Sequence, residues 1–261
     1  MIPKTIHYCW FGHNPKPKLA QKCIKSWEKH CADYKIIEWN EENFDISSAP
    51  QYVKEAYAAQ KWAFVTDYVR LWVLVVFGGI YMDTDVQVLK SLDPFLANRA
   101  FSGFEDEKNI PTGIMGSEKG LPLFRELLSF YDTARFYLPD GSINYQTNVT
   151  TITNTCIKYG LIQNNSLQTI EGFTLYPKEV FCPIDYHTEK LRKTRNTVTI
   201  HWFAASWHNK EQEKWRKSKK KKLRKQLRKE RWDYIVHSPN RALRRVLGNE
   251  RYEALKKRLK R

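Results

Sequence analysis

The sequence predicts an α/β fold in which helices cover both faces of a mainly parallel sheet. Short apolar runs of strand length alternate along the chain with longer segments whose apolar residues recur at helical spacing, and this order is typical of an α/β/α sandwich. At 261 residues the chain is long enough for a domain with a sizeable core. Nine Trp, fourteen Tyr and thirteen Phe supply bulky side chains to fill that core.

The first half of the sequence predicts strands and helices in alternation. Strands are assigned from short apolar or alternating runs, and helices from apolar residues three or four positions apart. The predicted strands are 4–9, 34–39 and 80–82, with 86–89 as a continuation of the last. The predicted helices are 19–31, 49–59 and 62–77. The last of these helices is strongly apolar, so we expect it to be buried.

The second half continues the same alternation and then changes character. The predicted strands are 100–104, 113–116, 174–176 and 198–202. The predicted helices are 122–136 and 147–159. From residue 210 the chain is rich in Lys and Arg, and two basic helices are expected over 210–232 and 241–260. The segment His237-Ser238-Pro239-Asn240 separates these two helices because it contains a helix breaker and capping residues.

Charge divides the chain into a predicted domain, 1–208, and a basic helical extension, 209–261. The first part holds 22 Lys and Arg against 22 Asp and Glu, whereas the second holds 22 against 6, so the formal net charge of +16 resides in the extension. A basic helical segment with embedded Trp and Leu is typical of helices that lie on anionic membranes. A solvated helix without a partner is the alternative. Nucleic acid is disfavoured as a partner because no nucleic-acid-binding signature accompanies the charge.

Cysteine usage and hydropathy indicate where the protein resides. Five scattered cysteines without a CxxC pair favour reduced thiols in the core over a zinc site or a disulfide framework. They are Cys9, Cys23, Cys31, Cys156 and Cys182. No secretory apolar segment follows Met1, and the longest apolar run, Leu71 to Phe77, is too short to span a bilayer. We therefore expect a soluble or peripheral cytoplasmic protein.

Two aspartates in the segment Gly78-Gly79-Ile80-Tyr81-Met82-Asp83-Thr84-Asp85 carry the strongest chemical signal. Residues i and i+2 of an extended chain point the same way, so Asp83 and Asp85 are expected to converge at the end of a strand. Two adjacent carboxylates repel each other unless a cation lies between them. Hard oxygen ligands suit Mg²⁺ or Mn²⁺. A solvated turn without a metal is the alternative interpretation of this tripeptide.

Asp67 and Arg70 form a second candidate pair. Their spacing places both on one face of the predicted helix 62–77. Because a buried Asp or Arg must be paired or bound to something polar, the pair is expected to form an internal ion pair or to contact a ligand. The two interpretations are equally open at this point.

These motifs, taken together, resemble the DXD-sugar-binding glycosyltransferases of family 32. The resemblance rests on Ala63-X3-Asp67-X2-Arg70 followed by Gly78 to Val86. It is extended by the opening residues 2–12 and by the closing segment Ile200 to Trp207, and so spans about residues 1 to 208. Related enzymes include the yeast initiating α-mannosyltransferase and, more distantly, the clostridial glucosylating toxins. The Gly-Pro pair that many relatives carry near Gln146-Thr147-Asn148 is missing, so acceptor-side residues are left unassigned.

The resemblance implies a metal site and a donor site. Asp83, Asp85 and His201 would ligate Mn²⁺ or Mg²⁺, with Asp83 also shared with the donor. A strand-end histidine bonded to backbone is the alternative for His201. Ser206 would donate to a phosphate oxygen. Trp207 would stack on the sugar or cover it, with core packing as its alternative.

The resemblance also implies contacts to the base and the transferred sugar. Trp10 would stack on the nucleobase, with hydrophobic capping of the sheet as its alternative. Asp67 would accept hydrogen bonds from sugar hydroxyls, and Arg70 would orient Asp67 and neutralise nearby charge. The expected catalytic set is therefore Asp67, Arg70, Asp83 and Asp85.

The implied enzyme is a metal-dependent, retaining hexosyltransferase with a GT-A-type, single Rossmann-like sandwich. Its donor would be a nucleotide-diphosphate sugar, with a uridine-diphosphate sugar favoured and guanosine-diphosphate mannose as the alternative. Its acceptor would be a hydroxyl of a glycan or lipid-linked saccharide in the synthesis of a surface polysaccharide such as a capsule, on the inner face of the cell membrane. A toxin-like protein glycosyltransferase and a non-catalytic basic membrane- or nucleic-acid-binding module are the alternatives.

Overall fold

The computed structural model describes residues 1–185, 188–204, 218 and 248. Residues 1–204 belong to one compact unit, Met1–Trp207. The predicted boundary at residue 208 and the two predicted basic helices concern residues that lie almost entirely outside the described ranges. Within the described residues, no helix combines the length and the apolar character needed to cross a bilayer.

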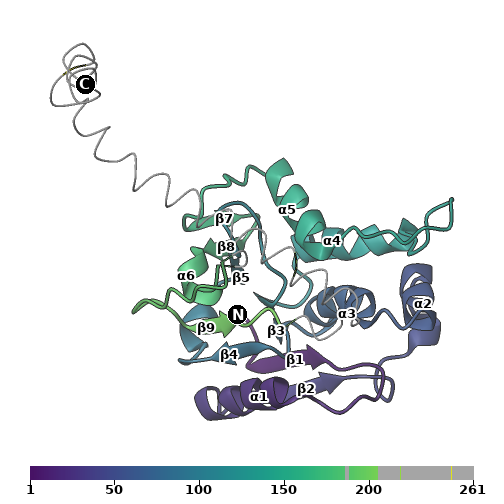
Figure 1. The fold of residues 1–261 in the computed structure, drawn as a ribbon, viewed down its shortest axis with the longest axis horizontal. Helices are drawn as coiled ribbons and strands as arrows, with labels where there is room; N and C mark the ends of the chain where they lie inside the picture. Colours follow the sequence, from purple (N-terminus) through teal and green to yellow (C-terminus); the bar gives the residue numbers. More distant parts are fainter. Residues whose placement is uncertain (186–187, 205–217, 219–247, 249–261) are drawn as a thin grey trace, which may run out of the picture. The chain divides into compact units, whose positions relative to one another are not determined.

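The described unit is an α/β/α sandwich, as the sequence predicts (Figure 1). In chain order the elements are β1 (Thr5–Cys9), α1 (Lys18–His30), β2 (Lys35–Trp39), α2 (Gln51–Ala58), α3 (Trp62–Val76), β3 (Gly79–Met82), β4 (Val86–Val88), β5 (Ala100–Gly103), β6 (Ile114–Ser117), α4 (Pro122–Thr133), α5 (Asn148–Lys158), β7 (Gln168–Ile170), β8 (Phe173–Tyr176), α6 (Lys178–Phe181) and β9 (Thr199–His201).

The central sheet has the strand order β2-β1-β3-β6-β5-β8-β7. Strand β1 pairs in parallel with β2 and β3, and β5 pairs in parallel with β8. Strand β6 is antiparallel to both β3 and β5, and β7 is antiparallel to β8. Five strands of this sheet therefore run in one direction and two oppose them, which confirms the mainly parallel sheet. The carboxyl ends of β1, β3 and β5 consequently lie along one edge.

Two hydrophobic cores lie on opposite faces of the sheet. Alternate residues of β3 divide between them, with Tyr81 in one core and Ile80 and Met82 in the other, as the pleat requires. The core on the Tyr81 side contains residues of α2, α3, α4 and α5, and the other core contains residues of α1, β4 and α6. All five cysteines are free and buried, as expected.

Helix α3 leads into β3 through two glycines in the left-handed region. Gly78 has φ of 68° and Gly79 has φ of 106°. A Cβ on Gly79 would lie 2.7 Å from the Thr5 carbonyl oxygen, so β3 can pair closely with β1 only without a side chain there. His7 secures this junction, because its Nε2 lies 2.9 Å from the Gly78 carbonyl oxygen and its Nδ1 accepts from the Trp39 indole at 3.1 Å.

One predicted strand was wrong in its pairing. Residues 86–89 do not continue β3, because the chain turns at Asp83-Thr84-Asp85 and the amide of Val86 donates to the Asp83 carbonyl at 2.9 Å. The segment instead forms β4, which pairs with β9 in a separate two-stranded sheet. Strand β7 was not predicted because it contains a single apolar residue and so no apolar or alternating run. Helix α6 was not predicted because four residues make only about one helical turn.

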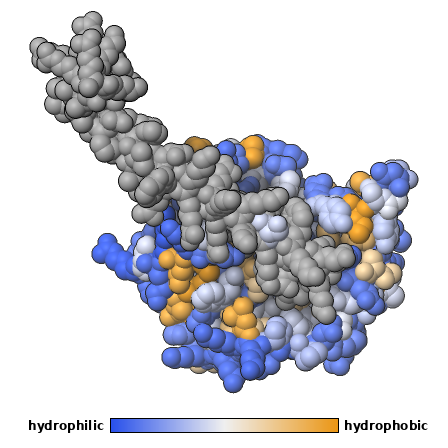
Figure 2. Space-filling model, viewed as in Figure 1, coloured by the Kyte–Doolittle hydropathy of each residue, from blue (hydrophilic) through white to orange (hydrophobic). Residues whose placement is uncertain are grey.

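Polar residues cover most of the face shown in Figure 2, and apolar residues appear there as separate patches.

Candidate functional site

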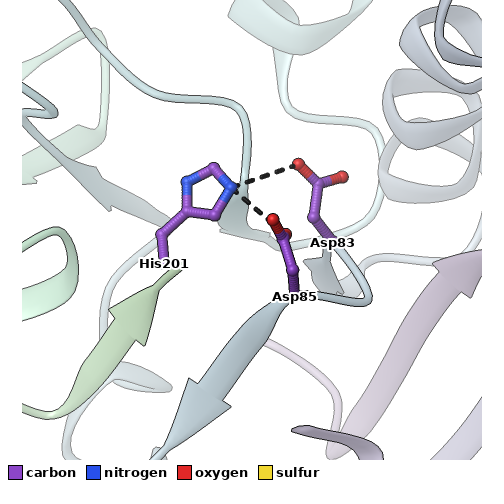
Figure 3. Close-up of side chains that lie close together, drawn as sticks. All are labelled: Asp83, Asp85 and His201. Atoms are coloured by element: carbon purple, nitrogen blue, oxygen red, sulfur yellow. Dashed lines mark ion pairs between the residues drawn. The ribbon is translucent and has the colours of Figure 1, made fainter. Parts of the chain in front are cut away.

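Asp83, Asp85 and His201 lie together beyond the carboxyl end of β3 (Figure 3). Nε2 of His201 lies 3.2 Å from Oδ1 of Asp85 and 3.9 Å from Oδ2 of Asp83. One ligand atom from each of the three residues lies within 4.8 Å of the others. The carboxyl ends of neighbouring parallel strands are where open α/β sheets bind ligands. The three residues expected from the sequence as metal ligands are therefore adjacent in the fold.

A turn brings the two aspartates together. The sequence analysis had predicted that they would point the same way in an extended strand, and this was wrong. The antiparallel pairing of β4 with β9 then places His201 opposite Val86. The segment after β9 encloses Asp85, because the amide of Trp202 donates to its main-chain carbonyl at 3.1 Å and the amide of Ala204 donates to its Oδ2 at 2.7 Å. Asp85 therefore holds a fixed orientation toward His201.

Opposite charges stabilise the ionised forms of Asp85 and His201. Burial opposes the charged imidazole, but the Asp85 carboxylate outweighs it and raises the pKa of His201 well above its ordinary value. Burial also opposes the charged carboxylate, but His201 outweighs it and lowers the pKa of Asp85. The ring of Phe203 packs against the imidazole with centroids 4.2 Å apart. The carboxylate of Asp85 and the protonated ring of His201 therefore stabilise each other.

The donor set fits a divalent metal such as Mn²⁺ or Mg²⁺. Two carboxylates and one imidazole nitrogen are ligand types that these ions accept. The other imidazole nitrogen, Nδ1 of His201, is buried and makes no hydrogen bond of sound geometry within the described residues. The buried thiol of Cys182 interacts with the same ring. A metal at Nε2 would leave the ring proton on Nδ1, toward the protein interior.

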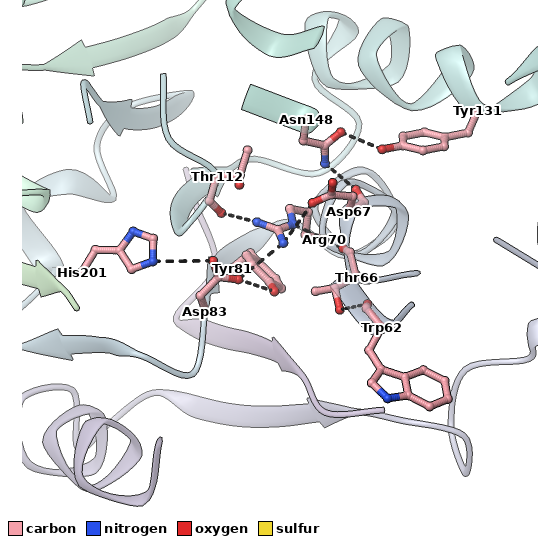
Figure 4. Close-up of polar contacts among 10 residues, drawn as sticks. All are labelled: Trp62, Thr66, Asp67, Arg70, Tyr81, Asp83, Thr112, Tyr131, Asn148 and His201. Atoms are coloured by element: carbon pink, nitrogen blue, oxygen red, sulfur yellow. Dashed lines mark hydrogen bonds and ion pairs between the residues drawn. The ribbon is translucent and has the colours of Figure 1, made fainter. Parts of the chain in front are cut away.

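Arg70 connects Asp83 with Asp67 (Figure 4). Its Nη2 lies 3.1 Å from Oδ1 of Asp67 and 3.5 Å from Oδ1 of Asp83. Its Nη1 donates to the Thr112 carbonyl at 2.8 Å, and its guanidinium lies 4.9 Å from the centroid of Tyr81. Arg70 is buried, and these contacts hold it rigidly. Arg70 therefore forms the internal ion pair with Asp67 and also contacts Asp83 of the DXD segment.

Asp67 is a largely buried carboxylate beside the start of α5, with 14% of its side chain exposed. Burial raises its pKa to about 6, with a further contribution from Asp83, although Arg70 and the backbone amide of Asn148 oppose the shift. The side chain of Asn148 donates to the Asp67 carbonyl at 2.6 Å and accepts from Tyr131 at 2.7 Å. Asn148 therefore ties the first turn of α5 to α3 at the position of Asp67.

Three residues near the site were not singled out by the sequence. Asn148 was noted only for a missing motif, and its contact with Asp67 depends on packing between distant helices. Gly113 leaves room for His201, since a Cβ there would lie 2.7 Å from Cε1 of the imidazole. Burial raises the pKa of Glu105 to about 7, and Asp83 adds to the shift whereas His201 opposes it. The position of Glu105 just after β5 is the one signal that would have indicated it.

Of the three remaining candidates, the structure describes Trp10 but not Ser206 or Trp207. Trp10 follows β1, and its indole donates to the Asn14 carbonyl at 2.6 Å while its ring packs beside the core on the α1 side. This placement agrees with hydrophobic capping, and stacking on a nucleobase stays a prediction. Ser206 and Trp207 lie outside the described residues, so their expected roles stay predictions as well.

A family model supports the identification of the central motif. Residues 17–102 match the model described as "Glycosyltransferase sugar-binding region containing DXD motif". The matched range includes Asp67, Arg70, Asp83 and Asp85 but not His201.

Curated relatives match about half of this chain. Inositol phosphoceramide mannosyltransferase 3 of Schizosaccharomyces pombe is 31% identical over 134 residues, which are 49% of this chain and 36% of the relative. Mannosyl phosphorylinositol ceramide synthase SUR1 of Saccharomyces cerevisiae is 29% identical over 139 residues, 49% of this chain and 34% of the relative. The uncharacterized glycosyltransferase L373 of Acanthamoeba polyphaga mimivirus is 30% identical over 137 residues, 48% and 53% of the two chains. The match thus spans about a third to a half of the relatives' length.

Similar solved structures are also glycosyltransferases. The PaToxG glycosyltransferase has a TM-score of 0.45 and 17% identity, covering 60% of this chain and 69% of its own. Galactosyltransferase LgtC, in complex with donor and acceptor sugar analogues, has a TM-score of 0.40 and 16% identity, covering 84% and 94%. Similarities this low bear on neither substrate nor mechanism.

Proposed function

We propose that this chain transfers a hexosyl unit from a nucleotide-diphosphate sugar to a hydroxyl group, since residues 17–102 match the DXD-containing sugar-binding region of glycosyltransferases. The observation that carries the proposal is the joining of Asp83, Asp85 and His201 to Asp67 through the buried guanidinium of Arg70. One end of this arrangement suits a cation and a diphosphate, and the other end offers a carboxylate to sugar hydroxyls.

The chain's own residues have separate tasks in this reaction. Asp83, Asp85 and His201 would hold the metal, which when bound offsets the negative charge that develops on the leaving diphosphate. Asp67 accepts hydrogen bonds from hydroxyls of the transferred sugar. Arg70 keeps the Asp67 and Asp83 carboxylates at fixed positions, and because it is buried it loses little by reorganisation during the reaction. The resemblance to retaining enzymes implies that the leaving phosphate oxygen receives the acceptor proton, so no protein nucleophile is needed.

Two donors are candidates: a uridine-diphosphate sugar, which the family resemblance implies, and guanosine-diphosphate mannose as the second candidate. The names of the curated relatives, which describe mannosyl transfer to inositol phosphoceramide, favour the second candidate. The same names support a lipid-linked acceptor over a free sugar. Thermal shift with Mn²⁺ and a panel of uridine- and guanosine-diphosphate sugars distinguishes the two donors, because the true donor raises the melting temperature at the lowest concentration.

A role in surface polysaccharide synthesis at the inner face of the membrane is part of the proposal. It rests on the +16 charge of the extension 209–261 and on the lipid acceptors in the relatives' names. Flotation with vesicles of anionic and neutral lipids, using the full chain and a chain ending at residue 208, tests this part. Unchanged binding of the shortened chain to anionic vesicles would contradict it. A protein acceptor, as in the toxin-like alternative, is tested by offering protein and saccharide acceptors side by side.

Donor hydrolysis with Mn²⁺ tests the central proposal. The full chain is expected to release nucleoside diphosphate only when the metal is present, and Asp85→Ala is expected to lose this activity at saturating metal. Asp33→Asn is a matched control, because Asp33 is an exposed aspartate that pairs with Lys4 near the amino end of β2. Undiminished hydrolysis in Asp85→Ala would end the proposal.

A further inference from the structure

Tyr145 is the most exposed aromatic side chain among the described residues, with 67% of its surface accessible. It lies in the segment 134–147 between α4 and α5, here called the 134–147 hairpin because Tyr137 and Ile143 form an antiparallel bridge within it. Tyr137 and Leu138 of the same hairpin are also exposed, at 43% and 41%. Exposed aromatic rings on one loop are a recurrent feature of ligand-binding surfaces.

The hairpin holds Tyr145 on a well-secured backbone. The amide of Phe136 donates to Oε2 of Glu55 at 3.0 Å, and Phe136 itself is fully buried. The amide of Asn144 donates to the Phe136 carbonyl at 2.8 Å, and the amide of Gln146 donates to Oδ1 of Asn144 at 3.0 Å. These hydrogen bonds fix the backbone of the hairpin, so the exposure of Tyr145 does not result from a loosely held loop. A ligand that covers the exposed ring would remove its apolar surface from water.

Tyr145 lies beside the sugar end of the proposed site. Its ring contacts Phe64 edge-on with centroids 6.3 Å apart. Phe64 precedes Asp67 by three residues on α3, so the two lie on the same side of that helix. Asn148, three residues after Tyr145, donates to the Asp67 carbonyl at 2.6 Å. Segment 145–148 thus runs alongside residues 64–67, beside Asp67.

We propose that Tyr145 is the platform on which the acceptor's sugar ring stacks, with its hydroxyl directed toward the donor sugar held at Asp67. An aromatic face matches the C–H face of a pyranose ring. The exposed side chains of Gln146 and Thr147 follow directly and supply polar groups for the ring's hydroxyls. The acceptor class is therefore a glycoside and not a protein side chain. This inference rests on the proposed glycosyl transfer and assigns its acceptor side.

The test uses a panel of p-nitrophenyl hexopyranosides as acceptor probes, measured by saturation-transfer NMR with Mn²⁺ and a nucleoside diphosphate present. We expect the full chain to bind at least one glycoside, and Tyr145→Ala to weaken that binding about tenfold or more. Tyr145→Phe keeps the ring and is expected to bind nearly as well as the native chain. Tyr137→Ala, in the same hairpin but not in contact with Phe64, is the matched control and is expected to leave binding unchanged.

Donor hydrolysis by Tyr145→Ala is measured in parallel and is expected to equal that of the native chain. If the native chain itself does not hydrolyse the donor, the proposed function is refuted. The glycoside measurement tests the acceptor assignment independently of that result. The assignment fails if the native chain binds no glycoside of the panel, or if Tyr145→Ala binds as the native chain does. Binding to neutral lipid vesicles is measured for the same variants. The assignment also fails if Tyr145→Ala and Tyr137→Ala both reduce vesicle binding equally and glycoside binding is unchanged, because the hairpin would then contact lipid.

Discussion

Nε2 of His201 lies 3.2 Å from Oδ1 of Asp85, and the amide of Ala204 secures the other oxygen of the same carboxylate. Asp85 outweighs the effect of burial and raises the pKa of His201, so the protonated ring is stabilised beside this carboxylate. A metal and a proton therefore compete for the same nitrogen. Several properties of the site depend on this competition and on the buried charges next to it.

Binding of Mn²⁺ is expected to release a proton. His201 must lose its proton to become a ligand through Nε2, and its raised pKa favours the protonated ring at neutral pH. Calorimetry at pH 7 in two buffers of different ionisation enthalpy should give heats that differ by about one proton per metal bound. His201→Gln should bind more weakly and show a smaller buffer dependence. Equal heats in both buffers for the native chain would refute this prediction.

Gly113→Ala is expected to weaken metal binding. The new Cβ would lie 2.7 Å from both Cε1 and Nδ1 of His201, so the imidazole must move away from the aspartates. Gly113 is not among the glycines with positive φ, so the effect is steric. Displaced ligands and their supports typically cost about ten- to a hundredfold in metal affinity. Gly160→Ala, where backbone strain occurs without any neighbour within 4 Å, is the control and should leave the Mn²⁺ affinity as it is.

Asp67→Asn is expected to stabilise the fold while reducing transfer. Burial raises the pKa of Asp67 to about 6, above the unfolded value near 4, so the stability associated with its protonated form is present below pH 4 and is lost as the pH rises through 6. At pH 7.5 the neutral amide avoids this cost, which is about 3 kcal/mol. Urea unfolding should show a higher midpoint for the variant and kinetics a lower rate. A lower midpoint at pH 7.5 would show that the carboxylate is needed for the fold.

His7 is expected to cause a loss of stability in acid. Burial lowers its pKa to about 4, although its bond to the Gly78 carbonyl opposes the shift. The folded state therefore favours the neutral ring, so this contribution is present above pH 6.5 and is lost as the pH falls toward 4, by roughly 3 kcal/mol. Asp67 has the opposite slope over nearly the same range, and the two partly cancel in the native chain.

The His7 contribution is best measured in the Asp67→Asn background. Urea unfolding between pH 4 and 7 should there show stability rising with pH. Adding His7→Asn should lower the stability at pH 7 and remove most of that slope. A slope unchanged by the second substitution would assign the acid loss to other groups.

Local patterns were sufficient for most of the elements around the site. Helices α1 and α3 and strands β1 and β3 form close to where hydrophobic spacing places them, because a period of 3.6 or 2 residues is a property of neighbouring residues alone. The Asp67 and Arg70 pairing was foreseen for the same reason, since a helix places residues three apart on one face. Strand β7 has a single apolar residue and helix α6 is only four residues long, so neither shows the pattern of its element in the sequence.

By itself, the sequence determined the α/β sandwich, the buried helix α3 and the identity of the acidic motif, since each depends on residues close together in the chain. Only the tertiary structure decided that Asp83 and Asp85 meet through a turn, that β4 pairs with β9 and so delivers His201, and that Asn148 supports Asp67. These relationships join segments far apart in the chain. Which strands pair and which helices meet depends on how whole sheet and helix faces pack against one another, and no short window of residues encodes it.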